Sequence, residues 1–201
     1  MRIAANYGLQ KTPMVIRTAL PATWPAPMPD EKLRRELTAG SGDNAKLVFA
    51  GGAFSPVRCG AALLDAMRLL PPHYSLIFSG MADTGPAAMT VHSEADRRGL
   101  AGRVRIVGHL PFDRLMQVMA SSDIGILLYP DDGFGNYHQA PGRFTEYLLA
   151  GLPFVTSNFP SLQAPAEQYD LGIACDPTDS RALASAIESL GARTEDRSAG
   201  R

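Results

Sequence analysis

The residues whose types and spacing could do chemistry lie at 141–160, PGRFTEYLLAGLPFVTSNFP, where a short helix is followed by an apolar strand. The free N–H groups and positive dipole end of a helix start favour an anion, and Arg143 adds a full charge in the first turn. Glu146 could accept hydrogen bonds from a sugar hydroxyl beside that anion, as an acidic residue does toward ribose in dinucleotide sites. A phosphate beside a ribose indicates a nucleotide.

A second candidate for phosphate binding is the loop AGGAFSPVRCG at residues 50–60. Gly51 and Gly52 let the backbone approach a ligand closely, and Arg58 stands where the next helix is expected to begin. A GG turn after a strand is more often a plain connection, but this one gains weight from Arg143 and Glu146, expected at the same sheet edge. The loop lacks the G-x-G-x-x-G fingerprint, which argues against a nicotinamide dehydrogenase.

These residues must be positioned by an α/β fold, because short β-branched or aromatic runs alternate with helical patterns over residues 46–190. The alternation predicts a Rossmann-like, doubly wound parallel sheet of about six strands. We expect strands at 46–52, 74–80, 103–109, 124–130, 153–159 and 171–176. We expect helices at 59–70, 87–99, 112–120, 141–150, 162–169 and 179–190. In the first helix, Leu63, Ala66, Met67 and Leu70 recur at helical spacing and predict a stripe facing the sheet.

The two ends of the chain differ from this core. Residues 1–45 are expected to form an interdomain strand, MVIRT at 14–18, and a connector, because PATWPAPMPD has four prolines in ten residues. Trp24 in this connector is expected to pack on the domain or to mark a surface that a further domain covers. The polar residues 191–201 predict a frayed, disordered tail. A length of 201 residues fits one domain plus an arm.

Composition narrows the class of partner. The chain is 45% apolar and 19% charged with a formal net charge of -1, and it has no Lys/Arg-rich run, so neither nucleic acid nor an anionic membrane is favoured. Cys59 and Cys175 lie in separate expected elements without C-x-x-C spacing, which suggests neither a disulfide framework nor a zinc site. No apolar run suggests a spanning helix or a signal peptide, so a cytoplasmic protein is expected.

Four segments carry a resemblance to a known family: LVFAGGAFSPVRCGAALLDAM, RVRIVGHLPFDRLMQVMASSDIGILLYP, PGRFTEYLLAGLPFVTSNFP and LGIACDPTDSRALASAIESL. Through them, residues 46–190 resemble the C-terminal, nucleotide-sugar-binding domain of the group four (group 1) retaining glycosyltransferases, one half of a GT-B fold. The resemblance implies hexosyl transfer from a nucleoside-diphosphate sugar, most commonly UDP-linked, to a carbohydrate or lipid-linked acceptor. It implies no cofactor and no metal.

The resemblance also implies roles for individual residues. Arg58 would neutralise the donor diphosphate, and Glu146, at the second glutamate of the family's E-x7-E motif, would hold the ribose hydroxyls. The backbone around Val107 and Gly108 would border the base. The full donor-binding set is Gly51, Gly52, Arg58, Val107, Gly108, Arg143 and Glu146.

The first acidic position of that motif departs from the family. It falls on His138, whereas Asp132, in the E-G-F-G-like DDGFG, lies fourteen residues before Glu146. A second branch of the family, N-x4-P-x-K-x-x-E-Y, fits better, with Asn136, Pro141 and Glu146 in place and Arg143 instead of Lys. We take His138 and Asp132 as the catalytic candidates. The adjacent Asp131 and Asp132 resemble a metal-binding D-x-D motif only superficially.

Enzymes of this type close two Rossmann-like domains over a cleft, and only one such domain is recognisable here. Transfer requires an oriented acceptor and exclusion of water, so we expect donor binding with little or no transfer by this chain alone. A truncated product, or one half of an enzyme whose N-terminal acceptor domain is a separate partner, would explain the pattern. The alternatives are a non-catalytic nucleotide-sugar-binding protein and a fragment of a sugar-nucleotide 2-epimerase.

Overall fold

The structure, a computed structural model, describes residues 8, 10, 19–21, 23–42, 44–52 and 59–199, with side chains described up to residue 193. The expected strand at 14–18 and Arg58 lie outside the described residues. Within them, six strands form one parallel sheet in the order β3-β2-β1-β4-β5-β6. The strands are β1 Lys46–Gly51, β2 Tyr74–Ser79, β3 Val104–Ile106, β4 Ile124–Leu127, β5 Phe154–Ser157 and β6 Gly172–Cys175.

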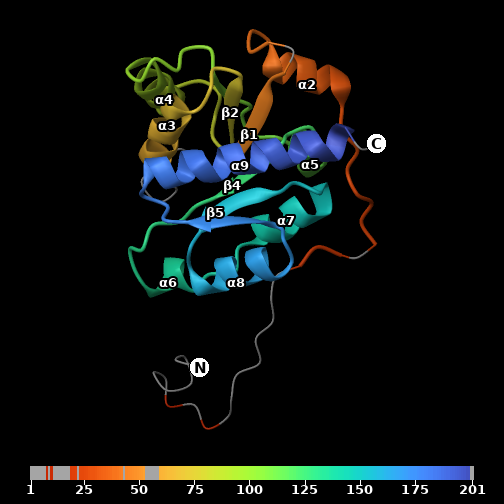
Figure 1. Ribbon diagram of the computed structural model, residues 1–201, viewed down its shortest axis with the longest axis vertical. Coiled ribbons are helices and arrows are strands. Elements are labelled where there is room, and N and C mark those ends of the chain that lie inside the picture. The colour runs from red at the N-terminus through yellow and green to blue at the C-terminus, as the bar shows by residue number, and fades with distance from the viewer. Residues whose placement is uncertain are drawn as a thin grey trace.

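The strand order reverses between the neighbours β1 and β4, which is the arrangement of a doubly wound sheet and confirms the predicted fold class. In such sheets the crevice at the carboxyl ends of the strands, where the order reverses, is where ligands bind. Figure 1 shows the sheet surrounded by helices, with the long α9 crossing the front.

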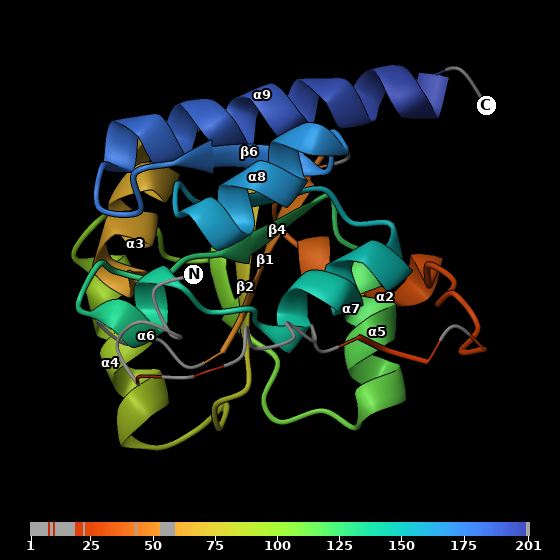
Figure 2. The ribbon, with the colours of Figure 1, turned by 90° about the horizontal axis from the view of Figure 1, so that it is seen from below.

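Helices cover both faces of the sheet, and each face has its own apolar core. On one face lie α3 Gly60–Leu69, α4 Pro86–Asp96 and α9 Ser180–Ala199. On the other lie α2 Glu31–Thr38, α5 Phe112–Ala120, α7 Gly142–Ala150 and α8 Pro160–Gln168. The four-residue α6 Phe134–Tyr137 precedes α7. Figure 2 shows α9 and α3 well separated from α5, α7 and α2.

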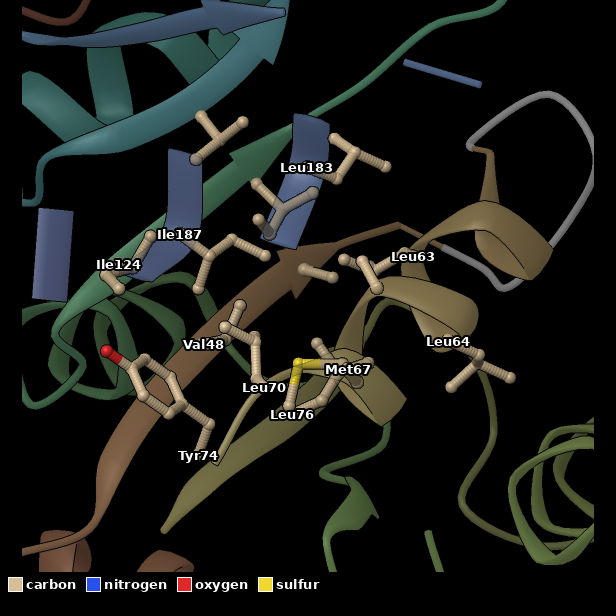
Figure 3. Packing of buried hydrophobic residues seen from close by; sticks show 14 of the residues in the cluster. Val48, Leu63, Leu64, Met67, Leu70, Tyr74, Leu76, Ile124, Leu183 and Ile187 are labelled. Atoms are coloured by element: carbon tan, nitrogen blue, oxygen red, sulfur yellow. The ribbon is translucent and has the colours of Figure 1, made fainter. Parts of the chain in front are cut away.

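The core under α3 and α9 confirms the predicted helical stripe. Leu63, Ala66, Met67 and Leu70 are all buried. In Figure 3, Leu63 and Met67 of α3 meet strand residues that include Val48, and Leu183 and Ile187 of α9 enter the same cluster. These apolar contacts hold α3 and α9 against the same face of the sheet.

Helix α2 is an element that the sequence patterns missed, and it lies within the predicted connector. Asp30 caps it by accepting from the N–H groups of Lys32 and Leu33, both at 3.0 Å. Arg34 then donates to Asp123, at 3.0 Å, just before β4, and Asp123 also accepts from the N–H of Leu47 at 2.7 Å. These bonds attach α2 to the amino end of the sheet, away from the candidate site.

The connector before α2 lies along α5. The ring of Trp24 packs against that of Phe112, the first residue of α5, in a tilted arrangement with 4.8 Å between centroids. The N–H of Asp30 donates to Ser121 at the end of α5. The expectation that Trp24 packs on the domain is therefore confirmed.

The predicted tail is wrong for residues 191–199, because α9 continues to Ala199. Gly191 suggests a helix end, yet it lies inside α9, where a Cβ atom would collide with the hydroxyl of Tyr74. No helix in the described part of the chain is long and apolar enough to cross a membrane.

Candidate functional site

The carboxyl ends of β1, β2 and β3 are joined by backbone hydrogen bonds that bring three predicted site residues together, Gly52, Val107 and Gly108. The N–H of Gly52 donates to the carbonyl of Ser79 at 3.0 Å, and the N–H of Gly80 donates to that of Gly108 at 3.2 Å. The N–H of Val107 donates to the carbonyl of Phe78 at 2.9 Å. The three strand ends therefore form one continuous edge.

Arg143 reaches this edge from α7 and lies directly against Gly51. A Cβ atom built on Gly51 would lie 2.6 Å from Nε and 2.8 Å from Cζ of Arg143, so the guanidinium occupies the space that a side chain would need. The same guanidinium carbon lies 5.9 Å from the ring centroid of Phe49. Glycine at position 51 thus allows a positive charge to approach the backbone at the end of the central strand.

Glu146, the predicted ribose ligand, is paired with Arg143. Nη1 of Arg143 lies 2.5 Å from Oε2 of Glu146, three residues along the same helix. The two side chains are 21% and 19% exposed, respectively. The pair is therefore in contact with solvent, and both charged groups are satisfied before any ligand binds.

Helix α7 is held in place by Tyr147, which points into the sheet. Its side chain is completely buried, and its hydroxyl donates to the carbonyl of Ile126 at 2.8 Å. Burial raises the pKa of the Tyr147 phenol far above its usual value, so it remains a neutral donor. Gly125 makes room for the ring, since a Cβ there would lie 2.8 Å from it.

The start of α7 lies at the carboxyl edge of the sheet, and no side chain caps it. Pro141 at the N-cap position provides no side-chain hydrogen bond, and its carbonyl accepts from the N–H of Phe144 at 3.1 Å. The N–H groups of Gly142 and Arg143 at the helix start keep the character of an anion site. Because α7 follows β4 in a parallel sheet, this start lies at the carboxyl edge, which agrees with the Arg143 contact on Gly51.

The two predicted catalytic residues lie on the segment between β4 and α7. Asp132 accepts a hydrogen bond of 2.6 Å from Asn136. The ring of His138 packs on Phe134, with 4.5 Å between centroids, and on Tyr137, with 4.9 Å between centroids. Within the described residues, neither Asp132 nor His138 has a hydrogen bond or ion pair with Arg143 or Glu146.

Asp132 nevertheless lies near Cys59, at the start of α3. Burial raises the pKa of the Cys59 thiol to about 11, and the charges of Asp132 and Asp176 add to that rise. Cys59 directly precedes α3, so Asp132 is close to the helix start that follows the second candidate loop. No group of three or more His, Cys, Asp or Glu side chains that could hold a metal occurs in the described part of the chain.

The sequence patterns missed one polar residue at this edge, Ser79. It closes β2 in register with Gly51 and is only 1% exposed. Its Oγ atom has no hydrogen-bond partner within the described residues. The sequence feature that could have identified Ser79 is its position directly after the run YSLIF, at the end of an expected strand.

A family model described as "Glycosyl transferases group 1" matches residues 32–199. Among solved structures, HepE from Anabaena in complex with UDP and glucose has 27% sequence identity and a TM-score of 0.64. The match covers 82% of this chain and 42% of HepE. HepE has also been solved with UDP-glucose, at 25% identity and a TM-score of 0.63, over 82% of this chain and 43% of that one.

Sucrose-phosphate synthase from Thermosynechococcus elongatus shares the fold at 22% identity, with a TM-score of 0.66 over 88% of this chain and 42% of the synthase. The chain therefore spans less than half the length of these solved structures. No curated protein matches the chain.

Proposed function

The chain belongs to the group 1 glycosyl transferases, and from this premise we propose that it binds a nucleoside-diphosphate sugar at the edge formed by Gly51, Arg143 and Glu146. The observation that carries the proposal is the placement of the Arg143 guanidinium on Gly51, beside the uncapped start of α7. A cation, a helix start and a side-chain-free strand end together suit a diphosphate. UDP is the proposed nucleotide, because HepE has been solved with UDP and with UDP-glucose.

The Arg143–Glu146 pair is compatible with this role, since a nucleotide offers each partner a replacement. A phosphate oxygen can take the place of the carboxylate as the acceptor for Arg143, and ribose hydroxyls can donate to Glu146 in place of the guanidinium. Neither charge is left without a partner after the exchange, which avoids the cost of an uncompensated charge. Both side chains are partly exposed, so a ligand can reach them.

The reaction we propose is retaining transfer of the sugar to an acceptor, with the leaving diphosphate stabilised by Arg143, Arg58 and helix starts rather than by a metal. Asp132 and His138 are proposed to face the donor sugar, from the segment between β4 and α7. The acceptor site and the wall that excludes water are proposed to come from a second domain, as the GT-B resemblance implies.

Calorimetric titration with UDP, GDP and ADP tests the binding step. We expect saturable heat with UDP, and the same titration of Arg114→Ala should be unchanged, because this half-exposed arginine on α5 contacts none of the edge residues. If none of the three nucleotides gives saturable heat at millimolar concentration, the proposed function is wrong.

A further inference from the structure

Ser79 stands apart from the other buried hydroxyl groups of the sheet. The hydroxyl of Ser157 donates to the carbonyl of Tyr129 at 2.9 Å, and that of Thr156 donates to Leu127 at 3.1 Å. Ser75, four residues earlier on β2, pairs with the hydroxyl of Ser41 at 2.6 Å. Among the buried serine and threonine side chains that the structure describes, only Ser79 has an unpaired oxygen.

The register of the sheet shows which way the Ser79 side chain points. Paired residues of adjacent parallel strands point to the same face, and Ser79 pairs with Gly51. The preceding same-face residues, Phe49 and Ile77, pack in the core under α7 and α5. The hydroxyl of Ser79 therefore lies on the α7 side, one strand away from the glycine on which Arg143 rests.

A buried hydroxyl without a partner loses its hydrogen bonds to water on folding, and such groups are rare in native structures. They call for an explanation, and a ligand is one that fits this location. On its other side, Ser79 lies next to the position of Val107, because β2 pairs with β3 up to Phe78 and Ile106. It thus lies between the proposed phosphate end and the proposed base end of the edge.

We propose that Ser79 is a further ligand-binding residue, whose hydroxyl donates a hydrogen bond to the diphosphate of the bound nucleotide. This inference rests on the proposed function. The Arg143 guanidinium beside Gly51 and the hydroxyl of Ser79 lie on the same face of neighbouring strands, so a phosphate oxygen that binds the guanidinium at this edge can also accept from Ser79. The hydroxyl then gains the partner that it lacks in the unliganded chain.

The test is the substitution Ser79→Ala, with Ser75→Ala as the matched control on the same strand and the same face. We expect Ser79→Ala to weaken UDP binding about tenfold or more, the effect of one hydrogen bond to a charged acceptor. Its melting temperature without ligand should stay the same or rise, because an unsatisfied hydroxyl is removed. Ser75→Ala should bind UDP as the unmodified chain does and should melt earlier, because it loses the bond to Ser41.

Equal UDP affinity of Ser79→Ala and the unmodified chain would overturn the inference while leaving the proposed function intact. If the unmodified chain gives no heat with any nucleotide, both proposals fail together. The preference for UDP over GDP and ADP should be the same in Ser79→Ala, because the contact is to phosphate. A changed preference would overturn the assignment to the diphosphate.

Discussion

Replacing Glu146 separates a ribose ligand from a carboxylate that merely stabilises its helix. In the unliganded chain Glu146 is one member of a partly exposed pair with Arg143, three residues away. Pairs of this kind are worth up to about 1 kcal/mol. For a domain of this size that amounts to a fall in melting temperature of no more than about 4 °C for Glu146→Ala.

The effect on binding has two parts of opposite sign. Two hydrogen bonds from ribose hydroxyls to a carboxylate are worth at least about 3 kcal/mol together. Removing Glu146 also frees Arg143 from its partner. Arg143 then has no ion pair to break before it binds the diphosphate, so the binding free energy becomes more favourable by up to about 1 kcal/mol. The net loss of about 2 kcal/mol corresponds to a roughly 30-fold weaker UDP complex.

A nucleotide without ribose hydroxyls isolates the second part. For 2′,3′-dideoxy-UDP, Glu146→Ala should bind as well as the unmodified chain or up to about fivefold more tightly, since only the release of Arg143 remains. The UDP affinity of Glu146→Gln should lie between those of the unmodified chain and Glu146→Ala, because the amide oxygen of Gln still accepts a hydrogen bond but carries no charge.

Calorimetry with both nucleotides on the three proteins measures these effects. Glu188→Ala, at an exposed position of α9 on the other side of the sheet, is the control and should change nothing. If the unmodified chain and Glu146→Ala discriminate equally between UDP and its dideoxy analogue, the carboxylate does not touch the ribose. The most specific residue of the proposed site would then be assigned wrongly.

Two other substitutions test the site and its support. Arg143→Ala should weaken UDP binding by about 10- to 100-fold, as expected for lost charge-assisted bonds to phosphate, while the melting temperature without UDP falls by no more than about 4 °C, as for Glu146→Ala, because the same pair is lost. A larger loss of stability with unchanged affinity would make Arg143 structural. Gly125→Ala should destabilise the fold by about 1 to 3 kcal/mol in urea unfolding, because its Cβ would overlap the Tyr147 ring. Gly135→Ala, with open space around it, should not destabilise the fold, and equal effects of the two would refute the packing argument.

The strands were predictable because strands buried on both faces are nearly continuous apolar runs. The predicted strands extend beyond the observed ones at their carboxyl ends; after β4, for example, the buried residues Leu128 and Tyr129 continue the apolar run although the ladder has stopped. The turn at Gly80, with φ of 79°, ends β2 for conformational reasons that hydrophobicity does not reveal. Helix α2 was missed because Leu33 and Leu37 are its only apolar residues, and the contact of Arg34 with Asp123 spans 89 positions in sequence.

Part of the candidate site was also predictable from the sequence. Arg143 and Glu146 stood out by residue type, and spacing of three on a helix explains why they pair with each other. The contact of Arg143 with Gly51 joins two distant segments and follows only from the strand order. Ser79 was missed because the absence of a partner for a hydroxyl is a property of the whole packing around it, not of any local pattern.

The contact of Trp24 with Phe112 gives the protein a built-in optical probe. Trp24 is the chain's single tryptophan, so indole emission arises from one place, the point where the connector meets the start of α5. Phe112 follows Val107 and Gly108, at the proposed base end of the edge, by only a few residues in sequence. The colour and intensity of the emission therefore record whether the connector is seated on the domain, with no label added.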